Sequence, residues 1–410
     1  MPLNYRAAHN GRQVATDAID ESGAHLADGK VRAERSVYTT SGGDCVRNAR
    51  RVAQFVHGII IIGVGTMAFA VAPRTVAQPL PIENIQLRGD RFRGLHYREM
   101  TDEQRAMLYN VVNSARAVTN TTGNGPFNVL LRSPQVGERS QQLGNAIRFS
   151  SGLSGRLREI ATLMAGRAWT STYEWYAHAR YALDEGIDAA AVQAIAEHRQ
   201  PDLAALPAED VMVWRVSDEL LYTRRVSDAT FAEARAVLGE RRLSSAVTIA
   251  AYYEYVSMIL NVDRYPLPAD APPAAARAAH AVEPLAADAL YRSPTGKVTP
   301  RAPLANADTD AALAALGEAV ARDEESSPEV RDAVRRAVLR EWNRTPREAR
   351  DEVADRFSTE LLDTRTVSDA TFAAALAALG ERRLVNLIVL MGHANIRCAQ
   401  QALAGSDCLL

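Results

Sequence analysis

The sequence predicts an all-α protein, and three observations point to that class. Ala and Arg, both good helix formers, are abundant, while aromatic residues make up 6% of the chain. No alternating apolar and polar run between turn signals is long enough to predict a strand. Beyond residue 78 the chain instead reads as a succession of capped amphipathic helices. With 410 residues, 47% of them hydrophobic, it has enough apolar material for two or three domains.

Capping and turn signals mark the helices in order. Thr101 precedes a run with acidic residues in its first turn and an apolar stripe, which predicts a helix N-terminus. Ser133 followed by Pro134 predicts the next one. Gly186 is expected to end a single long helix. Beyond the helix at Thr101, the expected helices cover residues 133–149, 154–184, 188–197, 207–221, 227–237 and 240–261.

Residues 52–77 break the globular pattern. Arginines precede an uncharged apolar stretch that ends in alternating Ala residues, which is the layout of a secretory signal. The stretch is also just long enough to span a bilayer. We expect it to be a signal peptide or a membrane anchor, in preference to a buried core helix. The protein is then periplasmic, secreted or membrane-anchored, with the cytoplasm as the alternative. Because such signals normally start a chain, residues 1–51 are expected to be disordered or a gene-model artefact.

The remainder has two related parts joined by a linker. Eight of the 18 Pro residues fall between Asp263 and Asn306, mixed with Ala, so residues 266–306 are assigned to a semi-extended linker. After it the chain repeats itself in one constant register without a gap, which predicts an internal duplication. The matching segments are Arg215–Leu221 with Arg356–Leu362, Val226–Ala232 with Val367–Ala373, and Leu238–Leu243 with Leu379–Leu384.

A polar segment around residues 171–178 carries the candidate chemistry. Glu174 and His178 are four residues apart, so both lie on one helical face. A carboxylate beside an imidazole orients the ring and raises its basicity, as a general base or proton relay requires. Such pairs also occur on solvated helix faces, and the spacing leaves both interpretations open. Glu159 reaches the pair only if the helix bends or breaks at Gly166. No third ligand accompanies the pair, so no metal site is expected.

In combination, four segments resemble the carboxymuconolactone decarboxylase family, which also contains the alkyl hydroperoxidase D proteins. The segments are Gly125–Pro134, Leu157–Leu163, Tyr173–His178 and Gly186-Ile187. The likeness covers residues 95–265 and, in weakened form, residues 307–405. It implies two alkyl hydroperoxidase D-like helical domains in tandem, the second degenerate. It also implies a homo-oligomer, with the active site on the helix that carries the motif.

The hydroperoxidase branch of this family has a Glu followed by Cys-x-x-Cys-x-x-x-His. Laid on this chain, its two Cys fall on Ser171 and Glu174, so a thiol-dependent peroxidase is excluded. The resemblance to the decarboxylase branch implies His178 as proton donor or shuttle and Glu174 as its orienting carboxylate or the base. Glu159 is then a carboxylate that supports His178 and Glu174 without contacting the substrate. Arg148 could pair with a substrate carboxylate, but we interpret it as a surface charge.

The second copy lacks this chemistry. In the register of the duplication, Glu174 falls on Ala315 and His178 on Ala319. The second copy is therefore expected to be a packing partner that replaces a subunit contact of the family. His393 has no acidic partner in sequence and is interpreted as a core or interface histidine.

The composition excludes some of the remaining classes of function. A formal charge of −2 argues against a nucleic-acid partner, because phosphate contacts need clustered positive charge. Three Cys cannot form a disulfide framework, although Cys398 and Cys408 could bridge in an exported protein. We expect a cofactor-free lyase or isomerase acting on a small carboxylated or lactone substrate. The alternative is a non-catalytic helical oligomerisation or binding module.

Overall fold

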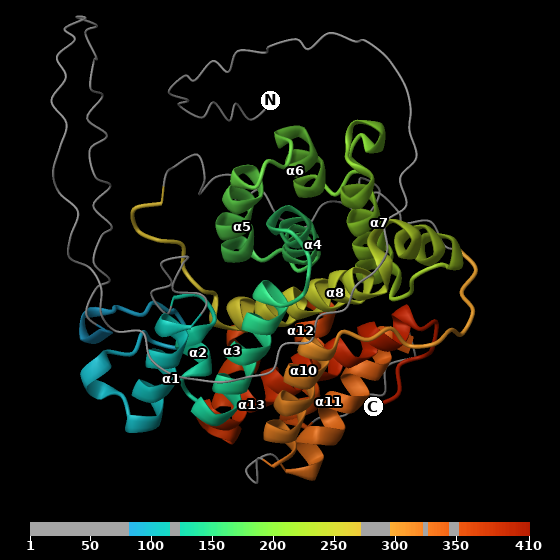
Figure 1. Cartoon of the computed structure of the whole chain (residues 1–410). Coiled ribbons are helices and arrows are strands. Elements are labelled where there is room, and N and C mark those ends of the chain that lie inside the picture. The colour runs from blue at the N-terminus through green and yellow to red at the C-terminus, as the bar shows by residue number, and fades with distance from the viewer. Residues whose placement is uncertain (1–81, 115–123, 272–295, 323–326, 344–351) are drawn as a thin grey trace, which may run out of the picture. The chain divides into compact units, whose positions relative to one another are not determined.

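The computed structural model describes residues 82–114, 124–271, 296–322, 327–343 and 352–410, all within one compact unit, Gln78–Leu410. These residues form helices joined by turns and loops, and they contain no strand beyond an isolated bridge between Gln86 and His96. The all-α prediction is confirmed for this part of the chain (Figure 1). The predicted leader and most of the Pro/Ala-rich segment lie outside the described residues.

Most helices begin at the capping residues that the sequence predicts. Thr101 caps α1 in a capping box with Gln104, and Ser227 caps α8 through the amide of Thr230. The helices are α1 (Asp102–Asn113), α2 (Phe127–Leu130), α3 (Pro134–Phe149), α4 (Gly155–Ala168), α5 (Thr172–Asp184), α6 (Ala189–Ala196), α7 (Ala208–Thr223), α8 (Asp228–Asp263), α10 (Ala307–Ala321), α11 (Pro328–Asn343), α12 (Val353–Thr364) and α13 (Asp369–Leu403). Short 3-10 helices lie at Ile82–Asn84, Tyr97–Glu99 and Leu203–Ala205.

The prediction of one helix over residues 154–184 is wrong, because the chain turns between α4 and α5. Thr170 adopts a left-handed conformation there, with φ +48°. Trp169, just before it, is fully buried, and its indole N–H donates a hydrogen bond to Glu254 of α8 (2.9 Å). This distant contact holds Trp169 in the core at the point where α4 ends.

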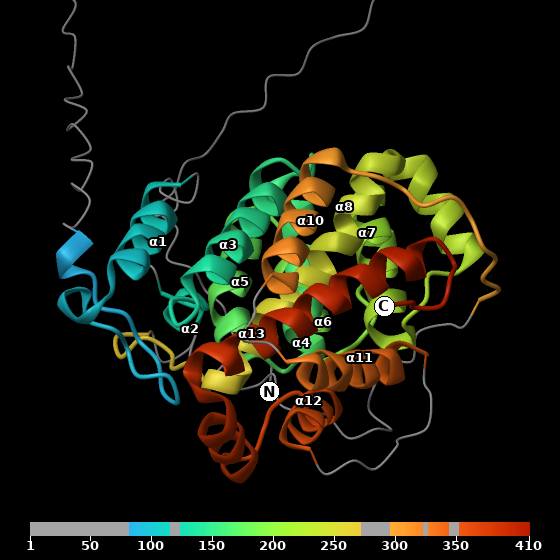
Figure 2. The same cartoon turned by 90° about the horizontal axis from the view of Figure 1, so that it is seen from below.

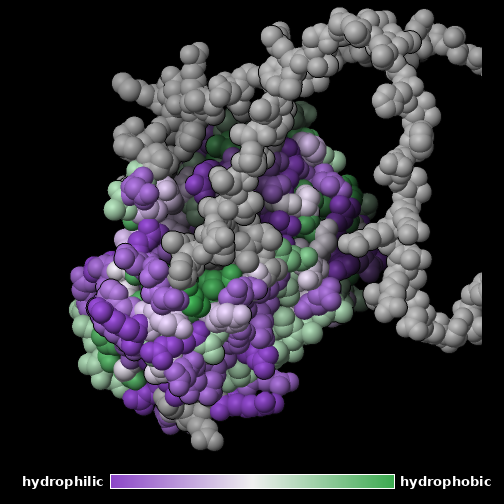
Figure 3. Space-filling view, turned by 60° about the vertical axis from the view of Figure 1, so that its left-hand side comes forward, coloured by the Kyte–Doolittle hydropathy of each residue, from purple (hydrophilic) through white to green (hydrophobic). Residues whose placement is uncertain are grey.

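The long helix α8 crosses the molecule between α4–α7 and α10–α13 (Figure 1). It bends at Gly239, where φ is +74° and ψ is 166°, as the two expected segments 227–237 and 240–261 indicated. Within the described residues, α8 alone is long and apolar enough to cross a membrane, but its apolar window is entirely buried, as in the core helix of a soluble protein. On the face that Figure 3 shows, hydrophilic residues predominate and hydrophobic ones form small groups.

The internal duplication is visible as two sets of helices. α7 and α8 correspond to α12 and α13 in the register that the sequence predicts, and the kink recurs at Gly380, where φ is +72° and ψ is 167°. α4 packs against α7 and α8, as α11 packs against α12 and α13. The two sets meet through α8 with α13 and through α3 with α10, which run beside each other in Figure 2. The matched helices are therefore α3, α4, α7 and α8 in the first copy and α10, α11, α12 and α13 in the second, and the first copy also contains α5 and α6.

The match between the helices of the two copies shows that the residue pairs expected from the sequence upstream of α7 are wrong. Trp169 at the end of α4 answers to Trp342 in α11, and each donates its indole N–H to an equivalent position, Glu254 or Asn395. The register changes there, because no described element of the second copy corresponds to α5 and α6. Ala315 lies in α10, the counterpart of α3, and so is not the structural equivalent of Glu174.

Candidate active site

Glu159, His178 and Glu174 form a continuous chain of buried ion pairs, which we call the relay, and His178 is also hydrogen-bonded to Glu159. The imidazole Nδ1 of His178 lies 2.5 Å from Oε2 of Glu159, and Nε2 lies 3.1 Å from Oε2 of Glu174. Glu174 and His178 are one turn apart on α5, whereas Glu159 is on α4. The break after α4 therefore brings together three residues that one straight helix would keep apart.

A glycine permits the two relay helices to cross closely. Gly166 remains helical in α4, and a Cβ placed on it would lie 3.4 Å from the Cβ of Glu174. The sequence indicated Gly166 as the site of a bend or break. The structure instead places the break after Ala168 and uses Gly166 for the approach of α5.

Arg148 closes the relay at its inner end and is not a surface charge, contrary to the sequence interpretation. Its side chain is 13% exposed, and its Nη2 lies 3.5 Å from Oε1 of Glu159. Its Nη1 donates to the hydroxyl of Tyr253 on α8. The apolar face of α3 packs inward, so the last turn of α3 delivers this cation to the buried carboxylate of Glu159.

Tyr253 is the member of the site that sequence reasoning missed. Its ring packs edge-on against the imidazole of His178, with ring centroids 5.0 Å apart, and its hydroxyl accepts from Arg148. Tyr253 lies within the apolar run of α8, where local sequence gives no signal that separates a site residue from a core aromatic. Only the packing of α8 against α3 and α5 identifies it.

The charges of the four ionisable groups balance, and this sets the state of the histidine. Burial opposes the imidazolium of His178, but the carboxylates of Glu159 and Glu174 outweigh it and hold the pKa of His178 well above its usual value. Burial likewise opposes the carboxylate of Glu159, and the charges of His178 and Arg148 lower its pKa despite this. His178 is thus an imidazolium near neutral pH, with Nδ1 hydrogen-bonded to Glu159 and Nε2 ion-paired with Glu174.

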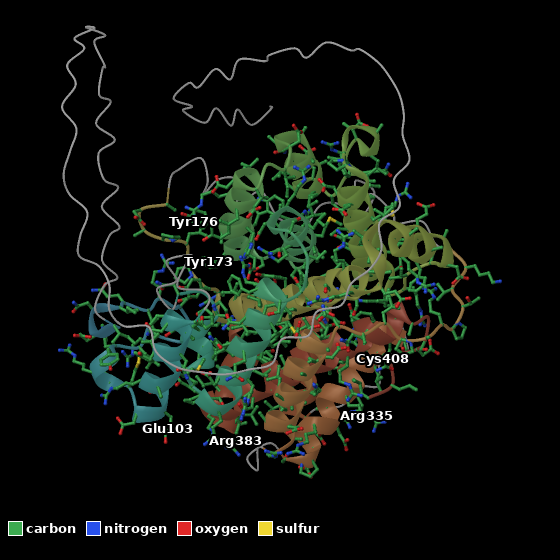
Figure 4. The ribbon with its side chains drawn as sticks, viewed as in Figure 1. Glu103, Tyr173, Tyr176, Arg335, Arg383 and Cys408 are labelled. Atoms are coloured by element: carbon green, nitrogen blue, oxygen red, sulfur yellow. A yellow bond between two sulfur atoms is a disulfide. The ribbon has the colours of Figure 1, made fainter. Side chains whose placement is uncertain are left out.

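The two positions where a thiol peroxidase needs cysteines have other chemistry. Ser171 precedes α5, is fully buried, and its hydroxyl has no hydrogen-bond partner in the described part of the chain. Glu174 is engaged with His178. Cys398 and Cys408 form a disulfide bond in the second copy, where Figure 4 shows Cys408 near the C-terminus.

Other candidate ligands are arranged differently. Among the described residues, no group of three or more His, Cys, Asp or Glu side chains is placed to hold a metal ion. His393 lies on α13 without an acidic partner, and burial together with the charge of Arg397 lowers its pKa to about 4. His393 is therefore neutral near pH 7, unlike His178.

Comparison of the chain with known protein families, with curated proteins and with solved structures finds no match. The resemblance to the carboxymuconolactone decarboxylase family accordingly rests on the motifs of the chain itself. The relay is the feature from which a function can be argued.

Proposed function

We propose that the first copy is a proton-transfer enzyme, a cofactor-free lyase or isomerase of the carboxymuconolactone decarboxylase type. The observation that carries the proposal is the relay, in which a buried imidazolium is held between two carboxylates. Side chains positioned in this way can transfer a proton to or from a reacting group with little rearrangement. Because Arg148 balances the second carboxylate, the relay keeps its charges in a buried site.

The roles follow from the order of the three groups along the relay. Glu159 is held by both Arg148 and His178, so it fixes the orientation of the ring. Glu174 is at the other end, on the first turn of α5, and is the group that exchanges a proton with a substrate. His178 supplies or takes that proton through Nε2 while Nδ1 keeps its bond to Glu159.

As a lyase, the enzyme would decarboxylate a lactone acid. The bond between carbon and the substrate carboxylate breaks, carbon dioxide leaves, and the electron pair stays on the carbon in conjugation with the lactone carbonyl. Nε2 of His178 passes its proton to the carboxylate of Glu174, and the carbon takes that proton from Glu174. One solvent proton then restores the imidazolium, so each turnover consumes one proton.

The proposed location is outside the cytoplasm. The disulfide between Cys398 and Cys408 supports this, because such bonds persist in oxidising compartments. N-terminal sequencing of the protein from its native source tests the idea. A mature chain that starts after residue 77, or that fractionates with membranes, agrees with the proposal, whereas a cytosolic chain starting at Met1 contradicts it.

The catalytic proposal is tested with Glu174→Gln and His178→Ala on a panel of lactone acids and keto acids. We expect both to lower kcat by about 10²–10⁴-fold, as removal of a general acid or base does. His393→Ala is the matched control, because it removes a histidine that has no carboxylate partner. Circular dichroism and melting temperature verify folding. The proposal fails if folded relay variants turn over a substrate as fast as the wild type does, or if the wild type turns over none of the panel.

A non-catalytic helical module is the second candidate, and the second copy favours it. That copy keeps the helix packing and the capping residues, but its described residues hold no counterpart of the relay helix α5. If the wild type turns over none of the panel while the relay variants only lower stability, the relay is a structural ion cluster and this candidate is preferred. The expected homo-oligomer stays a prediction that light scattering of the purified protein decides.

A further inference from the structure

A cavity of about 440 Å³ lies at the N-terminal end of α5. One wall is the turn from Thr170 to Tyr173, and a second is formed by the end of α8 and the residues that follow it, including Tyr265. A third wall comes from the second copy, where Arg365 and Thr366 follow α12. Figure 4 shows Tyr173 at the end of α5 that faces α8. The cavity therefore adjoins the turn of α5 that carries Glu174.

The inner end of this cavity offers hydrogen-bond donors without acceptors. Ser171 is fully buried, so it lies away from the mouth, and its hydroxyl has no partner among the described residues. The first amide of α5 with a backbone acceptor is that of Trp175, which donates to the carbonyl of Ser171. The preceding amides, those of Thr172, Tyr173 and Glu174, have no acceptor in the described part of the chain. Unpaired amides at a helix N-terminus, with a buried hydroxyl beside them, form an anion-binding arrangement.

The side of the cavity is aromatic and suits a ring. Tyr173 and Tyr265 pack edge to face with centroids 4.6 Å apart. The guanidinium of Arg88 lies over both rings, 6.0 Å and 5.6 Å from their centroids. Nε of Arg88 is buried without a hydrogen-bond partner, and no ion pair neutralises this residue among the described residues. Its charge adds a positive potential to the aromatic wall.

The arginines at the mouth are paired with carboxylates and do not set the charge that the cavity accepts. Arg264 is paired with Asp90 and Asp369, and Arg365 is paired with Glu341. These arginines are already neutralised, so the net positive character comes from Arg88 and from the helix N-terminus. One negative charge matches this environment, whereas a dianionic phosphate exceeds it.

We propose that this cavity binds the carboxylate of a small ring-containing monoanion at the N-terminus of α5. The inference deepens the proposed function, on which its catalytic meaning rests, because it identifies the substrate class and places it beside Glu174. It also gives the second copy a role in the site. The inner end of the cavity belongs to the first copy. Thr366, which belongs to the second copy, lies at its mouth and completes it.

Binding of benzoate to the full chain tests the proposal, with benzamide as the neutral analogue of the same shape. Isothermal titration or ligand-observed NMR measures both. We expect benzamide to bind at least tenfold more weakly than benzoate. Ser171→Ala is expected to weaken benzoate binding about tenfold, as the loss of one hydrogen bond to a charged group does. The same change leaves the melting temperature equal or higher, because it removes a buried hydroxyl without a partner in the described part of the chain.

A second variant tests the contribution of the other copy. Thr366→Leu adds an apolar side chain at the mouth and is expected to weaken benzoate binding by at least fivefold. Ala373→Leu, at an exposed position of α13 that does not line the cavity, adds similar apolar bulk and is the control. The proposal is overturned if benzoate does not bind, if benzamide binds as well as benzoate, or if neither Ser171→Ala nor Thr366→Leu weakens binding.

The outcome is separable from that of the catalytic proposal. Glu174→Gln retains the amide at the helix N-terminus, so we expect it to keep benzoate binding within about twofold while it removes turnover. Benzoate binding with no turnover of any substrate supports the cavity and contradicts the enzyme. Turnover that depends on Glu174, with no benzoate binding, supports the enzyme and contradicts the cavity as its carboxylate site.

Discussion

In the first copy, residues 169–207 separate α4 from α7 and contain α5 and α6, whereas residues 344–352 separate α11 from α12 in the second copy. The helices on either side of these segments are built alike. Glu219 accepts from the amide of Ser227 and the hydroxyl of Thr230, and Glu360 does the same for Ser368 and Thr371. The duplicated part is thus a scaffold, and the candidate chemistry depends on helices that one copy has in addition.

The interface between the copies departs from symmetry at one buried position. Arg224 packs on Trp342 of the other copy and Arg365 packs on Trp169, with the same distance of 4.8 Å to the ring centroid. Equivalent positions on α8 and α13 hold Glu254 and Asn395, and the amide of Asn395 donates to Glu254 (2.9 Å). Two carboxylates at that distance would repel each other, so Asn395 converts a repulsive pair into a hydrogen bond.

Among the substitutions that test how alike the two copies are, those at the two arginines are expected to have the largest effect on stability. Arg224 is 4% exposed and pairs with Glu254 at 2.9 Å and Glu341 at 2.7 Å, while Arg365 is 25% exposed and pairs with Glu341 alone. We expect Arg224→Met to lower the free energy of unfolding by about 3–5 kcal/mol, because it leaves buried carboxylates uncompensated. Arg365→Met is the control and should cost clearly less. Urea unfolding measures both, and equal losses would contradict the asymmetry.

An intermediate effect is expected at the glycine kinks. Gly239 (φ +74°, ψ 166°) and Gly380 (φ +72°, ψ 167°) share a conformation that only glycine adopts easily, and a Cβ at either position would meet no atom within 4 Å. Replacement by Ala should therefore cost about 1–3 kcal/mol of unfolding free energy through the backbone alone. Urea unfolding of the two variants measures this, and losses that agree within experimental error confirm the equivalence. A loss in one copy only would show that the kinks serve different purposes.

The smallest effects concern the pH dependence of the two copies' histidines. The pKa of His178 is raised, so its stabilisation is complete below its unfolded value of about 6.5 and is lost as pH rises through the folded pKa. The pKa of His393 is lowered to about 4, so stability falls as pH drops from about 6.5 towards 4. Nitrogen-15 NMR at pH 7 should show both ring nitrogens of His178 protonated and His393 neutral. Unfolding of His178→Gln and His393→Gln across pH should show the opposite trends. A neutral His178 at pH 7 would contradict the charge balance of the relay.

Local signals in the sequence predicted much of this structure. Helix starts at Thr101 and Ser227 depend on side chains that bond to the amide three residues away. The spacing of Glu174 and His178, four residues apart, is also local and places both on one face of a helix. The prediction at Arg148 failed because a cation in a last helical turn has the same local pattern whether it faces solvent or a buried carboxylate.

The sequence by itself determined the all-α class, the capping sites, the duplication of α7 and α8 as α12 and α13, and the pairing of Glu174 with His178, since each depends on residues close together or on direct self-similarity. The tertiary structure decided the rest. The end of α4 depends on burying Trp169 against Glu254, 85 residues away, and that break brings Glu159 to His178. Arg148, Tyr253 and the cavity at Ser171 come from helices that meet only in the folded core. Periodicity describes which face of each helix is buried, but not which other helix that face meets.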